Sequence, residues 1–128
     1  MKFMMLVKAD KDYEAGQPPP PELMAAIGRL TEDAIRSRTL VDMGGLLPSS
    51  RGARVRVGRG KLTVIDGPFS EAKELVGGYA IFELKSREEA IRLGEDFMRA
   101  HADVLGPSYE GELEIRQLAE AGPEGTRP

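Results

Sequence analysis

The sequence has no cysteine, only one histidine, and no apolar run as long as the roughly 20 residues that a membrane-spanning helix needs. The absence of cysteine excludes disulfide frameworks, thiolate nucleophiles and thiolate zinc sites. One histidine without cysteine cannot form an ordinary nitrogen–sulfur metal centre, so we expect neither a metal nor another cofactor. The apolar start, residues 1–8, is too short for the core of a signal peptide, which favours a cytoplasmic location.

An excess of basic charge is also absent. The 18 Lys and Arg residues are outnumbered by 21 Asp and Glu residues, which gives a formal net charge of −3. Because no basic run is present, the chain lacks the electrostatic signature of a nucleic-acid-binding protein and of a protein that binds anionic membranes. The 128 residues are enough for one domain that buries a core without metal or disulfide cross-links.

The apolar spacing predicts strands at both ends of the chain and two amphipathic helices between them. Pro21 is expected in the first turn of the first helix, and Ser86 with Glu89 forms a capping box before the second. The predicted elements are a strand over 2–8, a helix over 22–39, a strand over 40–47, a hairpin over 53–65, a strand over 79–84, a helix after Ser86 and a strand over 112–118.

Without the hairpin this order is βαββαβ, which predicts a ferredoxin-like α+β fold with both helices on one face of the sheet. Residues 2–8 and 79–84 are apolar on both faces, as expected for the two central strands. The face that the helices leave bare needs a cover. A second copy that buries about 800 Å² would supply it, so we expect a homodimer through the sheet face. The alternative is that the hairpin or the C-terminal tail folds over the sheet.

The hairpin alternates valine and arginine before the turn at Gly58, Arg59 and Gly60. Arg54 and Arg56 share one face, where they either bind an anionic group or simply face solvent. The other face is aliphatic, with two expected cross-strand pairs: Val55 with Val64, and Val57 with Leu62.

The densest cluster of unusual residues is the segment 66–78, DGPFSEAKELVGG. Asp66 either forms an Asx-type turn or acts as a general acid or base. Gly67 is expected to supply an unusual φ, Pro68 to fix the next φ, and Phe69 to insert into the core. The segment has no phosphate-loop pattern, because its closing pair Gly77-Gly78 lacks the required spacing.

Three further charges of this segment are Glu71, Lys73 and Glu74. They either form a solvated face with local ion pairs worth under about 1 kcal/mol or take part in a site. A carboxylate close to Asp66 would raise the pKa of one partner and suit it to proton transfer. A carboxylate metal site formed by Asp66, Glu71 and Glu74 is the less favoured alternative.

The segment 66–78 matches the pattern D-G-P-F-x-E-x-K-E-x-x-G-G, and the chain resembles the DGPF branch of the YCII-related proteins. The opening strand MKFMMLVK and the E-x-R of residues 112–118 extend the resemblance over residues 1–118, a single domain followed by a loose tail, 119–128. The resemblance implies a dimeric α+β barrel and no known reaction. Related dimeric barrels act on small aromatic or lactone substrates.

Other YCII-related proteins carry a proposed His–Asp pair, with the histidine near the start of the first helix. Here that region reads Glu22-Leu23-Met24, and the single histidine is His101, in the second helix. His101 either balances the dipole at the helix end or binds substrate.

Two hypotheses follow. In the first, the chain is an enzyme, or the remnant of one, that acts on a small organic molecule in a cleft near Asp66. Asp66 and Glu71 would then transfer protons. Among the substrate-binding residues Arg54, Lys73 and His101, either Arg54 or Lys73 would orient an anionic group of the substrate. In the second, the chain is a non-catalytic binding or regulatory module, with a partner linked to a sigma factor of the extracytoplasmic type, because such genes neighbour those of the family.

Overall fold

The computed structural model describes residues 1–71 and 74–120. The main sheet has the antiparallel order β2-β5-β1-β6, and β3 and β4 form a separate two-stranded sheet. This is the predicted ferredoxin-like arrangement with β1 and β5 in the centre, although β5 starts earlier than expected, so that Gly77 and Gly78 lie in a strand. The elements are β1 Lys2–Lys8, α1 Lys11–Glu14, α2 Pro21–Arg36, β2 Leu40–Gly45, the 3₁₀ turn η1 Ser49–Arg51, β3 Ala53–Gly58, β4 Lys61–Asp66, β5 Val76–Glu83, α3 Arg87–Leu105 and β6 Leu113–Gln117.

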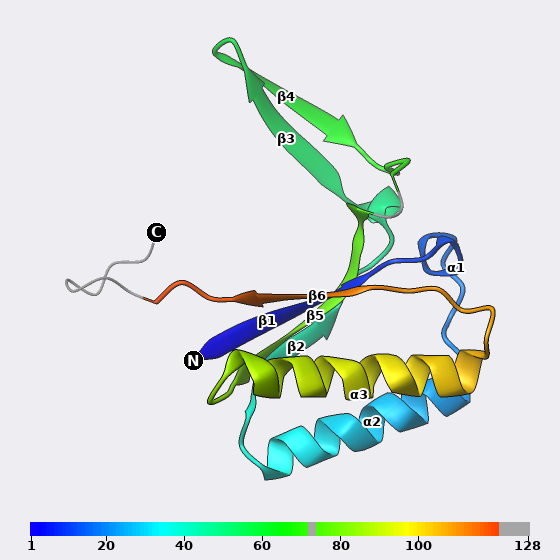
Figure 1. Ribbon diagram of the computed structural model, residues 1–128. Helices are drawn as coiled ribbons and strands as arrows, with labels where there is room; N and C mark the ends of the chain where they lie inside the picture. Colours follow the sequence, from blue (N-terminus) through cyan, green and yellow to red (C-terminus); the bar gives the residue numbers. More distant parts are fainter. Residues whose placement is uncertain (72–73, 121–128) are drawn as a thin grey trace.

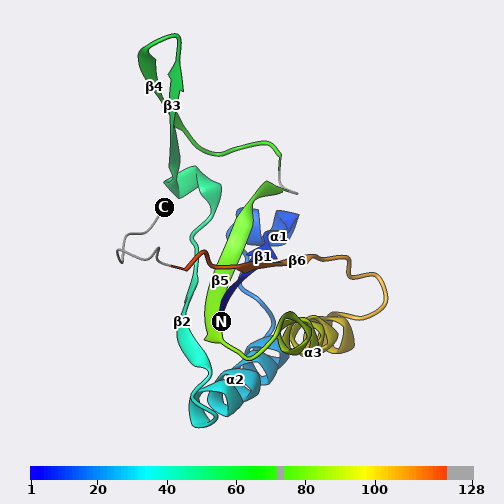
Figure 2. The ribbon, with the colours of Figure 1, turned by 60° about the vertical axis from the view of Figure 1, so that its left-hand side comes forward.

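Helices α2 and α3 cover one face of the main sheet (Figures 1 and 2). Phe3 and Met5 of β1 point to this side and are 2% and 3% exposed. They form the core with Leu84 and Ala90. The opposite face, which we call the open face, has a centre of half-buried apolar residues from β1 and β5: Met4, Leu6, Tyr79 and Ile81.

Helix α2 starts at Pro21, as predicted, but ends at Arg36 rather than near Thr39. Arg38 adopts a left-handed conformation, with φ 59°. The backbone N–H groups of Arg38 and Thr39 donate to the carbonyls of Ile35 and Ala34 at 3.1 and 3.0 Å. This is a Schellman motif, and it has arginine where glycine is usual, so the sequence carried no recognisable stop signal.

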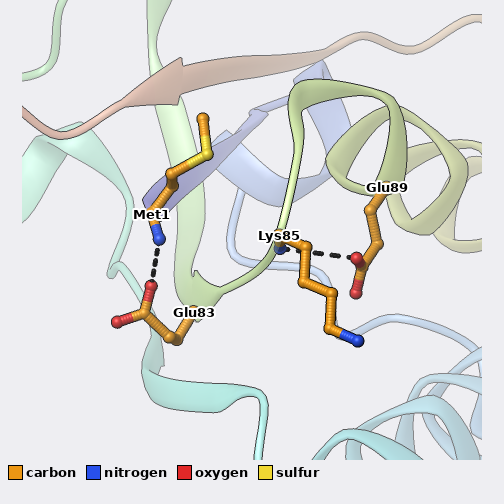
Figure 3. Close-up of polar contacts among 4 residues, drawn as sticks. All are labelled: Met1, Glu83, Lys85 and Glu89. Atoms are coloured by element: carbon orange, nitrogen blue, oxygen red, sulfur yellow. Dashed lines mark hydrogen bonds and ion pairs between the residues drawn. The ribbon is translucent and has the colours of Figure 1, made fainter.

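Helix α3 starts at the predicted N-cap, where the Ser86 hydroxyl accepts from the Glu89 backbone N–H at 3.1 Å. The return bond of the predicted capping box is displaced by one residue: the Glu89 carboxylate accepts from the backbone N–H of Lys85, at 3.4 Å, and not from that of Ser86 (Figure 3). Beside it, the Met1 ammonium pairs with the Glu83 carboxylate at 2.5 Å. The residues of α3 that are buried against the body are Ala90, Gly94 and His101.

The β3–β4 hairpin projects from the body, away from α2 and α3 (Figures 1 and 2). Its turn residues Arg59 and Gly60 have φ 51° and 78°, as a type I′ turn requires. The predicted pairs are confirmed. The hairpin does not fold over the main sheet, because its aliphatic face remains 66–76% exposed: Val55 70%, Val57 68%, Leu62 76% and Val64 66%.

Candidate functional site: a cleft between the sheet and the helices

A cleft of about 1110 Å³ lies between the helix-covered face of the main sheet and helices α2 and α3. It is large enough for the small organic molecules that proteins usually bind in clefts of this kind. Its wall is mainly apolar and combines side chains of the sheet, both long helices and the loop after α3, among them Val7, Leu23, Ile27, Phe82, Phe97 and Leu113.

His101 is a buried polar residue of this wall. Its side chain comes from α3 and is 7% exposed. Nδ1 lies 2.9 Å from the carbonyl oxygen of Phe97. Because a carbonyl oxygen only accepts, Nδ1 must carry the proton, and Nε2 of the neutral ring is an acceptor. The imidazole is held between the rings of Phe97 and Tyr109, whose centroids are 4.6 and 5.8 Å away.

Nε2 of His101 has no hydrogen-bond partner among residues 1–71 and 74–120. In the same part of the chain, no fully enclosed side-chain nitrogen or oxygen lacks a partner. Nε2 is therefore not fully enclosed by the protein, and His101 is one of the residues that line the cleft. The histidine is thus fixed by its helix and two aromatic rings while it keeps one acceptor atom for a bound molecule.

Tyr109 and Asp10 line the cleft near His101. Burial raises the pKa of the Tyr109 phenol, and the Asp10 charge raises it further. Asp10 is held in place because it caps α1, where its carboxylate accepts from the Tyr13 N–H at 2.7 Å. The hydroxyl of Tyr13 in turn donates to the carbonyl of Leu46. At pH 7 the histidine side of the cleft therefore has a neutral phenol beside a carboxylate.

The charges around the cleft are mostly acidic. Asp10 and Asp12 line the end that α1 forms, while Asp33 and Asp96 line other parts of the wall. Asp33 and Asp96 pair with arginines of their own helices at 2.8 and 3.1 Å. Lys8, the one Lys or Arg among the described lining residues, pairs with a glutamate at 3.3 Å. The cleft thus offers carboxylates and little available positive charge.

Four glycines of the sheet also line the cleft: Gly44, Gly45, Gly77 and Gly78. A Cβ added to Gly45 would lie 3.7 Å from the Tyr13 hydroxyl, an ordinary contact. A Cβ added to Gly78 would lie 3.2 Å from the carbonyl oxygen of Gly44, which is tight. The sheet therefore presents bare backbone at this end of the cleft.

The start of the DGPF segment is outside this cleft and contacts η1. A Cβ on Gly67 would lie 1.7 Å from the carbonyl oxygen of Ser49, so only glycine fits. The expected reason was wrong: φ of Gly67 is not positive, and the close approach is what requires glycine. The N–H of Phe69 donates to the Ser49 hydroxyl at 3.0 Å, and the N–H of Ser49 donates to the Glu14 carboxylate at 2.8 Å.

Phe69 is half-buried beneath the Arg54 guanidinium, which lies 3.8 Å from the ring centroid. The prediction that Phe69 inserts into the core was wrong, since the ring packs at the base of the hairpin instead. Pro68 follows a cis peptide bond. Arg54 therefore stacks on the motif, and its guanidinium is not part of the cleft.

The two carboxylates expected to transfer protons are exposed and also lie outside the cleft. Asp66 is opposite Ala53 in the hairpin. Hydrogen bonds from the backbone and from Ser70, together with the Arg54 charge, lower the pKa of Glu71. This direction is opposite to the one expected of a carboxylate activated by a second carboxylate.

The remaining predicted residues divide between the motif and the cleft. The N–H of Glu74 donates to the Glu71 carbonyl at 2.9 Å, while Lys73 lies outside the described residues. Gly77 and Gly78 line the cleft, and so does His101. Sequence reasoning missed Asp10, Tyr13 and Tyr109. The only local signal for Tyr109 was an aromatic residue between two glycines, 106 and 111.

Among residues 1–71 and 74–120, no three His, Asp or Glu side chains come together in a way that could hold a metal ion. No helix of that part of the chain has the length and apolar character needed to cross a membrane.

The fold and the cleft define a small ferredoxin-like α+β protein with an apolar site beneath its helices. Comparison with protein families places this chain more narrowly: residues 1–106 match the YCII-related domain, and the protein belongs to that family. A protein of Rhizobium meliloti (strain 1021), described as uncharacterized, is 27% identical over 97 residues, which cover 76% of this chain and 73% of the relative.

Proposed function

We propose that this protein binds a small, largely apolar organic molecule in the cleft between the sheet and helices α2 and α3. The observation that carries the proposal is the position of His101, a histidine that lines a mainly apolar cleft and has its Nδ1 bound to the Phe97 carbonyl. Such a wall with few polar groups is typical of sites that recognise ring-containing ligands. The aromatic rings of Phe97 and Tyr109, next to His101, add flat surfaces for stacking.

Nε2 selects for a ligand that carries a hydrogen-bond donor. As an acceptor it binds an O–H or N–H group, and as a base it can remove a proton from such a group. The nearby Tyr109 hydroxyl stays protonated because its pKa is raised, so it can donate to a ligand oxygen. Together they suit a molecule such as a phenol or an amine, and any reaction there would be proton transfer.

The carboxylates of Asp10 and Asp12 select against an anion. An anionic ligand would be repelled by them and would find Lys8 already paired with Glu114. The ligand class is therefore neutral or positively charged. This differs from the anionic group expected for Arg54 and Lys73. In the proposed function the DGPF segment is structural, and proton transfer by Asp66 and Glu71 stays a prediction.

The proposal can be tested with three naphthalene probes that differ in one substituent: 2-naphthylmethylamine, 2-naphthalenemethanol and 2-naphthoate. Because His101 is the only histidine, its imidazole ¹H and ¹³C signals can be followed by NMR without assignment ambiguity. We expect saturable shifts with the amine and the alcohol, and at least about tenfold weaker binding of the carboxylate.

The matched variants are His101→Gln and Asp66→Asn, the latter outside the cleft. Naphthyl binding by His101→Gln is followed through the Tyr109 ring signals and should weaken at least about tenfold, while Asp66→Asn should retain the wild-type affinity. Equal binding of all three probes would contradict the charge argument. Loss of binding only in Asp66→Asn would move the site to the DGPF segment.

We also propose that the chain is a homodimer through the open face of the main sheet. Support comes from the apolar centre of that face, Met4, Leu6, Tyr79 and Ile81, over which neither long helix passes (Figure 1). Charged residues at its margin, among them Glu114 and Arg116, form ion pairs. An apolar centre with a charged rim is the usual composition of a protein interface. Replacing Ile81 with Glu should dissociate such a dimer.

A further inference from the structure

The aliphatic face of the β3–β4 hairpin has no cover within the described part of the chain. Its four large side chains, Val55, Val57, Leu62 and Val64, are each at least 66% exposed. Neither strand pairs with the main sheet. Isolated exposed hydrophobic residues are common on protein surfaces, but a continuous aliphatic stripe formed by cross-strand pairs is unusual.

A two-stranded hairpin alone is only marginally stable in water. Here the arginine face is attached to the body, since Arg54 stacks on Phe69. The aliphatic face has no such support. Packing it against an apolar surface would stabilise the hairpin and remove the exposed stripe.

From this geometry we infer that the hairpin is an arm that packs its aliphatic face against a second copy of this chain. The inference rests on the proposed homodimer and extends its interface. Burying an aliphatic side chain fully removes roughly 100 Å² of apolar surface, so four side chains at this exposure offer roughly 300 Å². A stable interface needs about 800 Å² from each partner.

The central residues of the open face are half-buried, so each offers only part of its apolar surface to a partner. The hairpin stripe would add its own exposed apolar area to the interface. The charges of the hairpin also fit a second copy. Arg54 and Arg56 lie on the face opposite the stripe, so the aliphatic faces of two copies can meet without bringing these arginines together.

The test uses two neighbouring residues of β4 that point to opposite faces. Leu62 belongs to the stripe, and Thr63, also exposed, is paired with Arg56 on the other face. Leu62→Glu and Thr63→Glu add the same side chain to the full-length protein, and circular dichroism verifies that both stay folded. Sedimentation equilibrium between about 1 and 100 µM then measures the dissociation constant of each.

We expect a wild-type dimer of the 14.0 kDa chain, a rise of at least about tenfold in the dissociation constant for Leu62→Glu, and less than about threefold for Thr63→Glu. A wild type that is monomeric throughout this range overturns both the homodimer and the arm. A dimer that Ile81→Glu dissociates and Leu62→Glu leaves intact overturns the arm alone. Equal weakening by both Glu variants of β4 also overturns it, because the effect would then be that of charge.

Discussion

Replacing Gly67 with Ala tests the structural role of the DGPF segment. The added Cβ would lie 1.7 Å from the Ser49 carbonyl oxygen, whereas a tolerable contact needs about 3.2 Å. The obstacle is backbone, so the segment must move away from η1 by about 1.5 Å. That movement breaks the hydrogen bond from the Gly67 N–H to the Gly52 carbonyl and the bond from Phe69 to Ser49, both 3.0 Å long.

Each lost hydrogen bond costs about 1 kcal/mol, and disturbance of the Arg54–Phe69 contact costs about 0.5–1 kcal/mol more. We therefore expect Gly67→Ala to lower the free energy of unfolding by about 2–3 kcal/mol. Urea denaturation followed by circular dichroism measures this difference.

The matched control is Gly58→Ala, at the end of β3, where an added Cβ has no neighbour within 4 Å and φ is not positive. Its stability should stay within about 0.5 kcal/mol of wild type. If Gly67→Ala is as stable as Gly58→Ala, the close contact with Ser49 does not exist, and the structural account of the motif fails.

Three further predictions concern the core, the margin of the open face and the cleft. Phe3→Ala removes a side chain that is 2% exposed and should cost about 3–5 kcal/mol in urea denaturation, whereas a cost below about 1 kcal/mol would contradict its place in the core. Hydrogen bonds from Arg116 and Lys8 lower the pKa of Glu114, so its stabilisation is complete above the ordinary value of 4.5 and is lost as the pH falls through the lowered folded-state value. Glu114→Gln should therefore flatten the decline in stability on acidification from pH 5, and an unchanged decline would contradict the pairing. Asp10→Asn should lower the raised pKa of Tyr109 in a titration of tyrosinate absorbance, with Tyr109→Phe identifying the signal, and no change would show that the carboxylate does not act on the phenol.

Local signals in the sequence were enough for most of the fold. The N-cap at Ser86, the proline at position 21 and the hairpin register depend on residues close together in the chain. The strands 2–8 and 79–84 were recognisable as central because only a central strand needs apolar residues on both faces. The end of α2 was not predictable, because Arg38 adopts a backbone conformation that its residue type rarely takes.

The site was harder to predict because its polar groups come from distant segments. Asp10, His101 and Tyr109 meet only after the loop that follows α3 returns toward the start of the chain. The DGPF segment attracted attention as a cluster of unusual residues. At Gly67 and Phe69 the unusual residues are explained by close packing against Ser49. From a sequence alone, residues required for such packing look the same as residues required for catalysis or binding.

Because Gly45 and Gly78 line the cleft without side chains, a substitution there can change the volume of the cleft without changing its polar groups. The Cβ of an alanine at position 45 would make a normal van der Waals contact with the Tyr13 hydroxyl. One methyl group can therefore shorten the cleft without contacting Asp10, His101 or Tyr109. In the proposed function, ligand size and ligand polarity would thus be governed by different residues. Relatives with this architecture could accept molecules of different length while they keep the same pattern of hydrogen bonding.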